Sequence, residues 1–412
     1  MNSRSGQWMN AVLPIATVSA GLSVLIPLYV LAFGGNVFDV GIVTALYSLV
    51  SIASLPMWGF LTDRWGSLKP MIMFSILGVF PILFILYLLQ SVAAAGIAYG
   101  LYAFVATAAS PSINILIMGR RRDTGLSKYI SEYTILVLIG GLLGLAPGAL
   151  LGAVAVQTYL ILMMAINTVS FAFAYVYVGK DAKAPSTKQS KRRRSFKILS
   201  YFARHRSVHP PDSFMTSRLH SAWKHKRSRN AIIVLASIAV FNFAQFLFST
   251  SYIPYLVGAG VTIGQVFILS MAELVGQMLV YAVVLYLMAD FFAYHNYRVS
   301  AYLKVLAIGS IVVLPALLSG ALLYSNLVGY VLYGVSFALW NVSASVILYD
   351  HIRSRNKEGR NIGVFMSLLS VSAFAGAICS GVVSSVYGYV PTFAISVILS
   401  LAAAAMISLE RK

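Results

Sequence analysis

Twelve long apolar stretches constrain this chain more than any other feature of its sequence. Each approaches the roughly 20 apolar residues that a helix needs to cross the hydrocarbon core of a bilayer. In lipid a helix pairs its backbone polar groups internally, so the sequence predicts an all-α membrane protein with twelve transmembrane helices. The stretches lie near residues 9–33, 40–62, 70–89, 94–118, 130–153, 157–178, 230–256, 264–289, 300–322, 326–349, 362–385 and 389–409.

The composition is typical of a membrane protein. Hydrophobic residues make up 59% and charged residues 10%, whereas soluble domains carry about 25% charged residues. The net charge of +19 does not indicate a nucleic-acid partner, because the positions of the basic residues explain it. The single cysteine, Cys379, excludes an internal disulfide. The first stretch exceeds the about 7–15 residues of a signal-peptide core, so we expect it to be a retained span.

The basic residues predict the direction of each span. They occur at the termini and in alternate connections, with Lys304 counted beside Arg298 in the connection after the eighth stretch. The other connections are short and contain no Lys or Arg. Under the positive-inside rule the basic side is the cytoplasm, and both termini are cytoplasmic.

Two matching pairs of residues indicate an internal repeat. Pro27 and Asp63 have counterparts in Pro254 and Asp290 at a common offset of 227. Repeated halves are typical of transporters, which place their binding sites between the halves near the bilayer midplane. The sequence therefore predicts two pseudo-symmetric six-helix bundles (6+6) joined by a basic cytoplasmic linker, with boundaries at 1–179, 180–229 and 230–412.

The linker, residues 180–229, is strongly basic. Phe196, Leu199 and Phe202 recur in it at helical spacing among basic residues. Such a segment can lie on the anionic inner leaflet of the membrane. The alternative is a flexible tether that obeys the positive-inside rule.

Two polar motifs interrupt the apolar pattern, "GFLTDRWGSLKP" at 59–70 and "EGRNIG" at 358–363. With twelve spans around them, they give the chain a resemblance to the major facilitator superfamily of secondary transporters, whose loop signature has the form G-x-x-x-D-R-x-G-x-x-K. The resemblance covers all twelve spans and implies a carrier that works by alternating access, which we expect to be a monomer. The residues that match the family's loop elements are Gly59, Asp63, Arg64, Gly66, Lys69, Asp290, Arg298, Glu358 and Arg360.

The resemblance implies that the first motif is a conformational latch. Gly59 allows another helix to approach closely, and Gly66 permits a tight turn. Asp63 would be stabilised by the N-terminus of a neighbouring helix, and would hold the two bundles together on the cytoplasmic side. The alternative is that Asp63 and Arg64 form a solvated loop pair.

One acidic residue, Glu273, lies deep inside an apolar stretch. Ionisable groups at that depth are costly and are therefore candidates for function. Gln277 follows one turn later on the same helix face. A carboxyl in lipid favours its neutral form, so Glu273 could carry a proton between the two sides. The alternative is a protonated structural glutamate bonded to a neighbouring helix.

The resemblance also implies that the first, fourth, seventh and tenth helices line a central cavity. Within the seventh stretch, Asn242 and Gln245 lie three residues apart on one face and form the preferred pair. The alternative role for each polar residue is an interhelical hydrogen bond of about 0.6 kcal/mol. The candidates on these helices are Asn114, Asn242, Gln245, Tyr252 and Asn341.

The function predicted from these features is proton-coupled transport at the cell membrane. The sequence predicts that no Lys or Arg lies within a span away from its cytoplasmic end, and an anionic substrate normally needs one. We therefore expect neutral, amphipathic or cationic substrates and drug-type export. The motif "GGLLGLAPGALLG" is similar to an exporter element, but Gly144 and Pro147 are not adjacent, and its glycines can instead serve helix packing.

Two other functions stay open, a proton symporter that imports a neutral solute such as a sugar, and a sensor that does not transport. An enzyme is not expected, because the sequence offers no nucleophile-and-base pair and no set of metal ligands. No cofactor or metal is expected.

Overall fold

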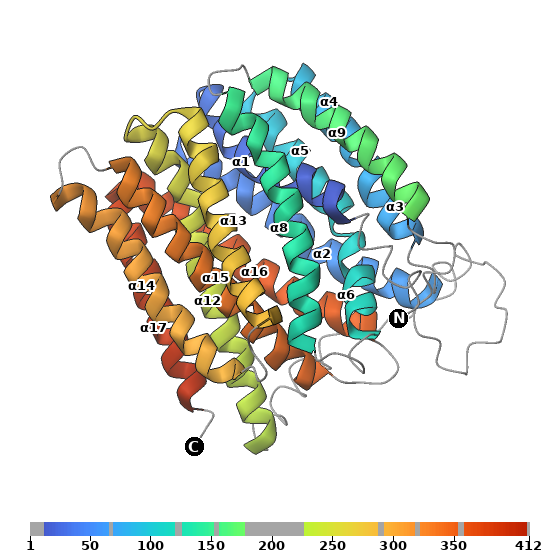
Figure 1. Cartoon of the computed structure of the whole chain (residues 1–412), viewed down its shortest axis with the longest axis vertical. Helices are drawn as coiled ribbons and strands as arrows, with labels where there is room; N and C mark the ends of the chain where they lie inside the picture. Colours follow the sequence, from blue (N-terminus) through green and yellow to red (C-terminus); the bar gives the residue numbers. More distant parts are fainter. Residues whose placement is uncertain are drawn as a thin grey trace, which may run out of the picture.

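The computed structural model describes residues 12–65, 69–119, 126–151, 156–177, 226–286, 292–317, 322–352 and 358–409. Within these ranges every regular element is a helix (Figure 1). The helices are α1 (Val12–Ala32), α2 (Val37–Trp65), α3 (Lys69–Leu77), α4 (Val79–Leu88), α5 (Val92–Ala106), α6 (Ala109–Gly119), α8 (Leu126–Leu151), α9 (Val156–Tyr177), α12 (Lys226–Gly258), α13 (Ile263–Tyr286), α14 (Ala293–Leu317), α15 (Leu322–Ile352), α16 (Glu358–Tyr387) and α17 (Tyr389–Ser408).

These helices form twelve segments that are long and apolar enough to cross a membrane, which confirms the predicted all-α fold with twelve spans. Helices α3 and α4 together make the third span, and α5 and α6 make the fourth. Most boundaries agree with the prediction to within a few residues. The ninth span differs more, because α14 begins at Ala293 and not at residue 300.

Proline explains why two spans are divided. Pro111 has no amide hydrogen to donate to the carbonyl of Thr107, four residues before it, so the helix breaks at that level. In its place the backbone N–H of Ser110 donates to the Thr107 carbonyl oxygen, at an N–O distance of 3.3 Å. The third span breaks at Gly78, three residues before Pro81.

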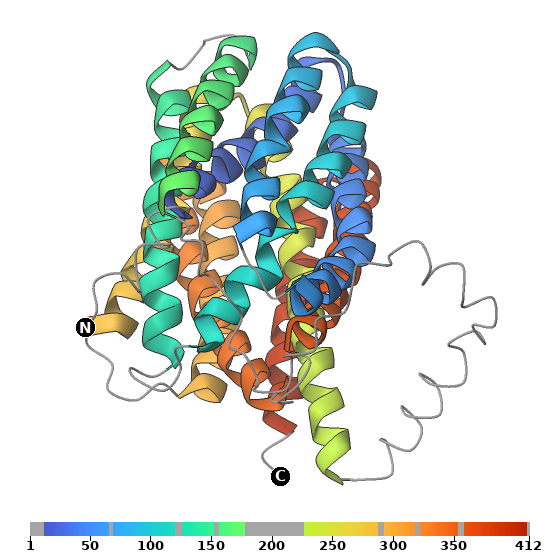
Figure 2. The same ribbon diagram turned by 90° about the vertical axis from the view of Figure 1, so that its right-hand side faces the viewer.

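The helices form two groups that lie side by side (Figures 1 and 2). We call α1–α9 the first half and α12–α17 the second half. The most extensive packing between the halves joins α2 to α16 and α8 to α13. Residues 178–225 lie outside the described part, so the predicted linker and its contact with lipid stay predictions. We call the helix ends next to Trp65, Lys69 and Ala293 the basic end; its cytoplasmic location also stays a prediction.

The same turn follows the first helix of each half. Gly34 and Gly260 have φ values of 84° and 82°, a backbone conformation that glycine adopts readily. Two residues later a reciprocal capping box begins the next helix, where Asn36 and Asp39 exchange side chain-to-backbone hydrogen bonds. Thr262 and Gln265 do the same before α13. These turns are spaced by 226 residues, close to the repeat inferred from the sequence.

The glycines of α8 have a packing role. A Cβ atom on Gly144 would lie 2.1 Å from the Thr17 carbonyl oxygen of α1, and one on Gly148 would lie 2.6 Å from the Phe267 ring of α13. Small residues let helix backbones approach closely in membranes. The glycine-rich motif therefore lets α8 pack tightly against one helix from each half.

Lys304 corrects the predicted charge distribution. It lies eleven residues after Ala293, or about 16 Å into α14. Its side chain is 0% exposed, and its Nζ has no hydrogen-bond partner. The amine lies 4.9 Å from the centroid of the Phe241 ring of α12. Lys304 therefore lies inside a span, because α14 begins earlier than the apolar pattern indicates.

We predict that Lys304→Met stabilises the protein. Methionine has a similar shape and removes an unpaired buried polar group, whose desolvation costs about 1–3 kcal/mol. The apparent Tm in detergent should therefore rise. Lys69→Met is the control, because Lys69 Nζ donates to the Tyr175 carbonyl oxygen at 3.0 Å and its loss should not stabilise. A lower Tm for Lys304→Met would contradict the prediction.

Candidate functional site

A cavity of about 250 Å³ lies between the two halves. Its lining comes from α1, α2, α5 and α8 of the first half and from α12, α13 and α15 of the second. The first, fourth, seventh and tenth spans all contribute, as the family resemblance implied. The lining residues are Ala20, Ser23, Val24, Pro27, Thr44, Tyr99, Leu145, Phe246, Ser249, Thr250, Ile253, Ser270, Glu273, Leu274 and Tyr330.

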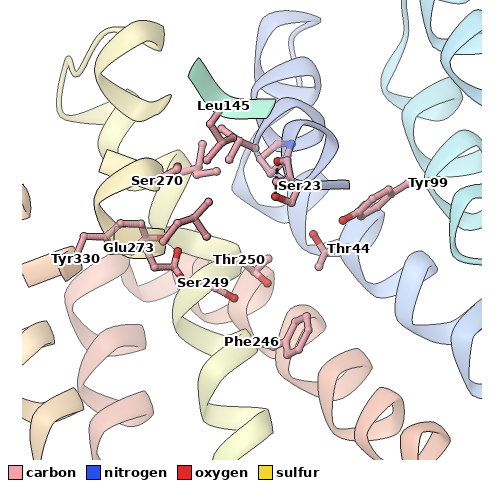
Figure 3. Close-up of a pocket in the computed structure, with 15 residues that line it drawn as sticks. Ser23, Thr44, Tyr99, Leu145, Phe246, Ser249, Thr250, Ser270, Glu273 and Tyr330 are labelled. Atoms are coloured by element: carbon pink, nitrogen blue, oxygen red, sulfur yellow. Dashed lines mark hydrogen bonds between the residues drawn. The ribbon is translucent and has the colours of Figure 1, made fainter. Parts of the chain in front are cut away.

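The two walls of the cavity differ in chemistry. Ser23, Thr44 and Tyr99 present hydroxyl groups from the first half (Figure 3). Glu273 and Tyr330 lie on the opposite side, on helices of the second half (Figure 3). A ligand between the walls would therefore meet hydroxyls on both sides but a carboxyl group only on the side of the second half.

Glu273 is held by its neighbours in the second half. Gln277, one turn along α13, donates from Nε2 to Glu273 Oε1 at 3.1 Å. The side chain of Tyr330 on α15 also interacts with the carboxyl group. These contacts fix the direction of the Glu273 side chain, which lines the cavity.

Stacked tyrosines extend from Glu273 into the second half. The rings of Tyr330 and Tyr252 stack with centroids 4.2 Å apart, and those of Tyr330 and Tyr333 with centroids 5.5 Å apart. The Tyr252 hydroxyl donates to Asn326 Oδ1 at 3.0 Å. The carboxyl group of Glu273 thus sits at the edge of a rigid aromatic cluster.

Two glycines bring the backbones of α13 and α15 together at this level. A Cβ atom on Gly334 would lie 2.1 Å from the Glu273 carbonyl oxygen, and one on Gly276 would lie 2.2 Å from the Val331 carbonyl oxygen. Because neither glycine has a side chain, the helices approach closely. This approach places Tyr330 beside Glu273.

Of the polar residues of the seventh span, Ser249 lines the cavity, whereas the candidates Asn242, Gln245 and Tyr252 do not. Asn242 donates from Nδ2 to the Leu369 carbonyl oxygen and to Ser372 Oγ of α16, both at 2.9 Å. Gln245 lies beside the hydroxyl group of Tyr333. The ring of Tyr252 stacks on the ring of Tyr330. The preferred pair thus joins helices of the second half.

The remaining polar candidates lie nearer the basic end. Asn114 Nδ2 donates to the Ser110 carbonyl oxygen of its own helix at 2.9 Å. Asn341 Nδ2 donates to the Tyr281 hydroxyl at 2.9 Å. Asn341 follows Tyr330 by eleven residues on α15, which corresponds to about 16 Å along the helix.

The latch residues are described in part. Gly59 is buried in α2, whereas Asp63 and Arg64 are exposed in its last turn, and Arg298 is half-buried in α14. Lys69 begins α3 and contacts Tyr175 of α9. Gly66, Asp290 and the side chains of Glu358 and Arg360 lie outside the described part.

The polar cavity residues that were not singled out from the sequence are Ser23, Thr44, Tyr99, Thr250, Ser270 and Tyr330. Each lies in an apolar stretch, where a serine, threonine or tyrosine has no distinguishing pattern. One signal was present for Tyr330, because Gly334 follows it by one turn and a glycine in such a stretch indicates close helix approach.

The fold and the cavity between halves define a membrane carrier. The family model of the Major Facilitator Superfamily matches residues 9–358, and the chain belongs to this superfamily of transporters. It is therefore a multi-pass membrane protein. No curated protein matches the chain.

Solved structures with a similar fold include two transporters. The nucleoside transporter NupG aligns with a TM-score of 0.66 and 14% identity over 100% of both chains; a mutant form of it aligns with a TM-score of 0.69. The human organic anion transporter MFSD10 (TETRAN) aligns with a TM-score of 0.64 and 14% identity, over 98% of this chain and 97% of its own. At this identity the likeness shows the fold alone.

Proposed function

We propose that the chain is a proton-coupled carrier of the cell membrane that exports small neutral, amphipathic or cationic organic molecules. The observation that supports this most is the position of Glu273, whose carboxyl group lines the cavity between the halves. An ionisable group inside the membrane is costly and tends to be retained for function. If the cavity opens to each side in turn, Glu273 can take up a proton on one side and release it on the other.

The lining of the cavity favours small substrates that are not anionic. Its residues include one carboxyl group and no Lys or Arg, and Lys304 is not among them. A carboxylate and the faces of Tyr99 and Tyr330 would attract a cation. The volume of about 250 Å³ is below the about 300–1,000 Å³ typical of pockets for drug-sized ligands.

The cavity also favours a second function, the import of a neutral solute such as a sugar together with a proton. Ser23, Thr44, Ser249 and Ser270 supply hydroxyl groups to the lining. Thr250 also lines the cavity, and its buried hydroxyl has no hydrogen-bond partner. A polyhydroxylated ligand could satisfy these groups, because buried polar atoms are normally hydrogen-bonded.

Proton flux in proteoliposomes tests the proposal and separates the alternatives. The protein is reconstituted with a trapped pH dye, and organic cations, sugars and organic anions are added outside. Exchange of substrate for proton would move the two in opposite directions, whereas symport would move them together. A substrate that binds but moves no proton would support a sensor. Organic anions as the transported class would contradict the proposal.

We also propose the latch role for Asp63. The first turns of α16 approach α2 closely, since a Cβ atom on Gly363 would lie 2.6 Å from the Leu55 carbonyl oxygen. We expect Asp63→Asn to shift the protein toward conformers that are open at the basic end, as measured by spin-label distances between α2 and α16. Asp39→Asn, at the other end of α2, is the control. Equal distributions for both variants and wild type would rule the latch out.

A further inference from the structure

A fully buried tyrosine lies in line with the acidic residue of the cavity. Glu273, Gln277 and Tyr281 follow at four-residue spacing, which places them on one face of α13. Tyr281 is 0% exposed. It lies two turns from Glu273, or about 12 Å toward the basic end. No step of the proposed transport cycle involves Tyr281.

The hydroxyl group of Tyr281 joins three helices. It accepts a hydrogen bond from Asn341 Nδ2 of α15 at 2.9 Å. The side chain of Thr134 on α8 lies beside it. Because α8 belongs to the first half, while α13 and α15 belong to the second, this hydroxyl lies between the two halves.

The Tyr281 hydroxyl lies in an apolar environment. Leu138 of α8, Val280 and Val284 of α13, and Ala338 and Val342 of α15 form one buried cluster with Tyr281. A hydrogen bond broken there leaves its partners without water, so the cost of breaking it is high. The cluster also occupies the interface that must open if the cavity is to reach the basic end.

We propose that Tyr281 is a positioning residue that couples the protonation of Glu273 to closure of the basic end. The proposal rests on the proton-coupled function proposed above. Helix α13 carries both residues, so a shift of α13 when Glu273 gains or loses a proton moves the Tyr281 hydroxyl relative to Thr134. On this proposal a hydrogen bond between the Tyr281 and Thr134 hydroxyls forms when the basic end closes and breaks when it opens.

Among the described residues, the other titratable groups near Glu273 are phenols. Tyr252, Tyr330 and Tyr333 face it from α12 and α15, and Tyr99 of α5 lines the same cavity. The groups that meet Tyr281 from α8 and α15, Thr134 and Asn341, do not titrate. Phenols ordinarily titrate at about pH 10. A response between acidic and mildly basic pH is therefore assigned to Glu273.

Labelling of a reporter cysteine tests the coupling. Val342→Cys in a Cys379→Ser background places one thiol in the apolar cluster, which a water-soluble maleimide reaches when the basic end opens. Each rate is divided by the rate for the denatured protein at the same pH. Tyr281→Phe is compared with Tyr297→Phe, a matched control whose fully buried hydroxyl donates to the Ser237 carbonyl oxygen within the second half.

With Tyr281 intact, we expect labelling to differ between acidic and basic pH, and Glu273→Gln to remove that difference. Tyr281→Phe should raise the rate about fivefold, as expected for the loss of one buried hydrogen bond, and should flatten the pH dependence. Tyr297→Phe should change neither. Matching Tm values would show that both variants are folded.

Two outcomes separate this inference from the proposed function. If labelling of the reporter with Tyr281 and Glu273 intact does not depend on pH, proton coupling at Glu273 fails. If it does depend on pH, and Tyr281→Phe keeps both the rate and the pH dependence, the role of Tyr281 is overturned while coupling stands. An equal rise in Tyr281→Phe and Tyr297→Phe would indicate general loosening and would also overturn it.

Discussion

Vesicles that contain Glu273→Gln should show substrate-driven proton movement no greater than that of empty vesicles. Glutamine keeps the shape of the side chain but cannot bind or release a proton between acidic and mildly basic pH. Its amide oxygen can still accept the hydrogen bond that Gln277 Nε2 donates to Glu273 Oε1, so the packing of α13 and α15 should persist. We therefore expect loss of coupling without loss of folding.

The control for this prediction is Glu132→Gln. Glu132 is exposed on the second turn of α8, near the basic end and away from the cavity. Its replacement should leave proton flux unchanged. A thermal-shift assay with the transported compound would show whether Glu273→Gln still binds it, because a ligand of the folded state raises the apparent Tm. Full proton flux in Glu273→Gln would assign coupling to another group.

Gly334→Ala should destabilise the protein and reduce transport. The added Cβ atom would lie 2.1 Å from the Glu273 carbonyl oxygen and 3.1 Å from the Gln277 backbone nitrogen. Both neighbours are backbone atoms, so α15 must move away from α13. Overpacking of this kind typically costs about 1–3 kcal/mol. The movement would also draw Tyr330 away from the carboxyl group of Glu273.

Gly309→Ala provides the matched control in the same half. A Cβ atom on Gly309 would meet nothing within 4 Å. Alanine is favoured over glycine in a helix by about 1 kcal/mol, so this variant should be at least as stable as wild type. Thermal unfolding and transport are measured for both variants. Equal stability and transport in the two would show that the contact between α13 and α15 does not control the site.

The fold could be predicted from the sequence because the bilayer requires long apolar helices, and their lengths are visible along the chain. The prediction was wrong for Lys304 because hydropathy marks the apolar part of a helix and not its beginning. The residues from Ala293 to Val299 include His295, Asn296 and Arg298, which interrupt the apolar pattern but continue the helix.

The candidate site was predictable only where one residue differed from its surroundings. Glu273 stood out as an acid within an apolar stretch, and Gln277 could be placed beside it from helical spacing. Tyr330 could not, because its position depends on how closely α15 approaches α13. Asn341 lies on a helix that lines the cavity, as predicted. Helical periodicity does not determine at which level of α15 the cavity lies, so the sequence could not show that Asn341 is too far along the helix.

The difference between the two walls of the cavity has a consequence for how this carrier could diversify. The ionisable group and its supports belong to one half of the chain, whereas Ser23, Thr44 and Tyr99 belong to the other. Under the proposed function, substitutions at these three positions could change which compound is accepted without altering the energy source. Natural variants with new selectivity are thus expected to differ first in the half that holds no acid at the cavity.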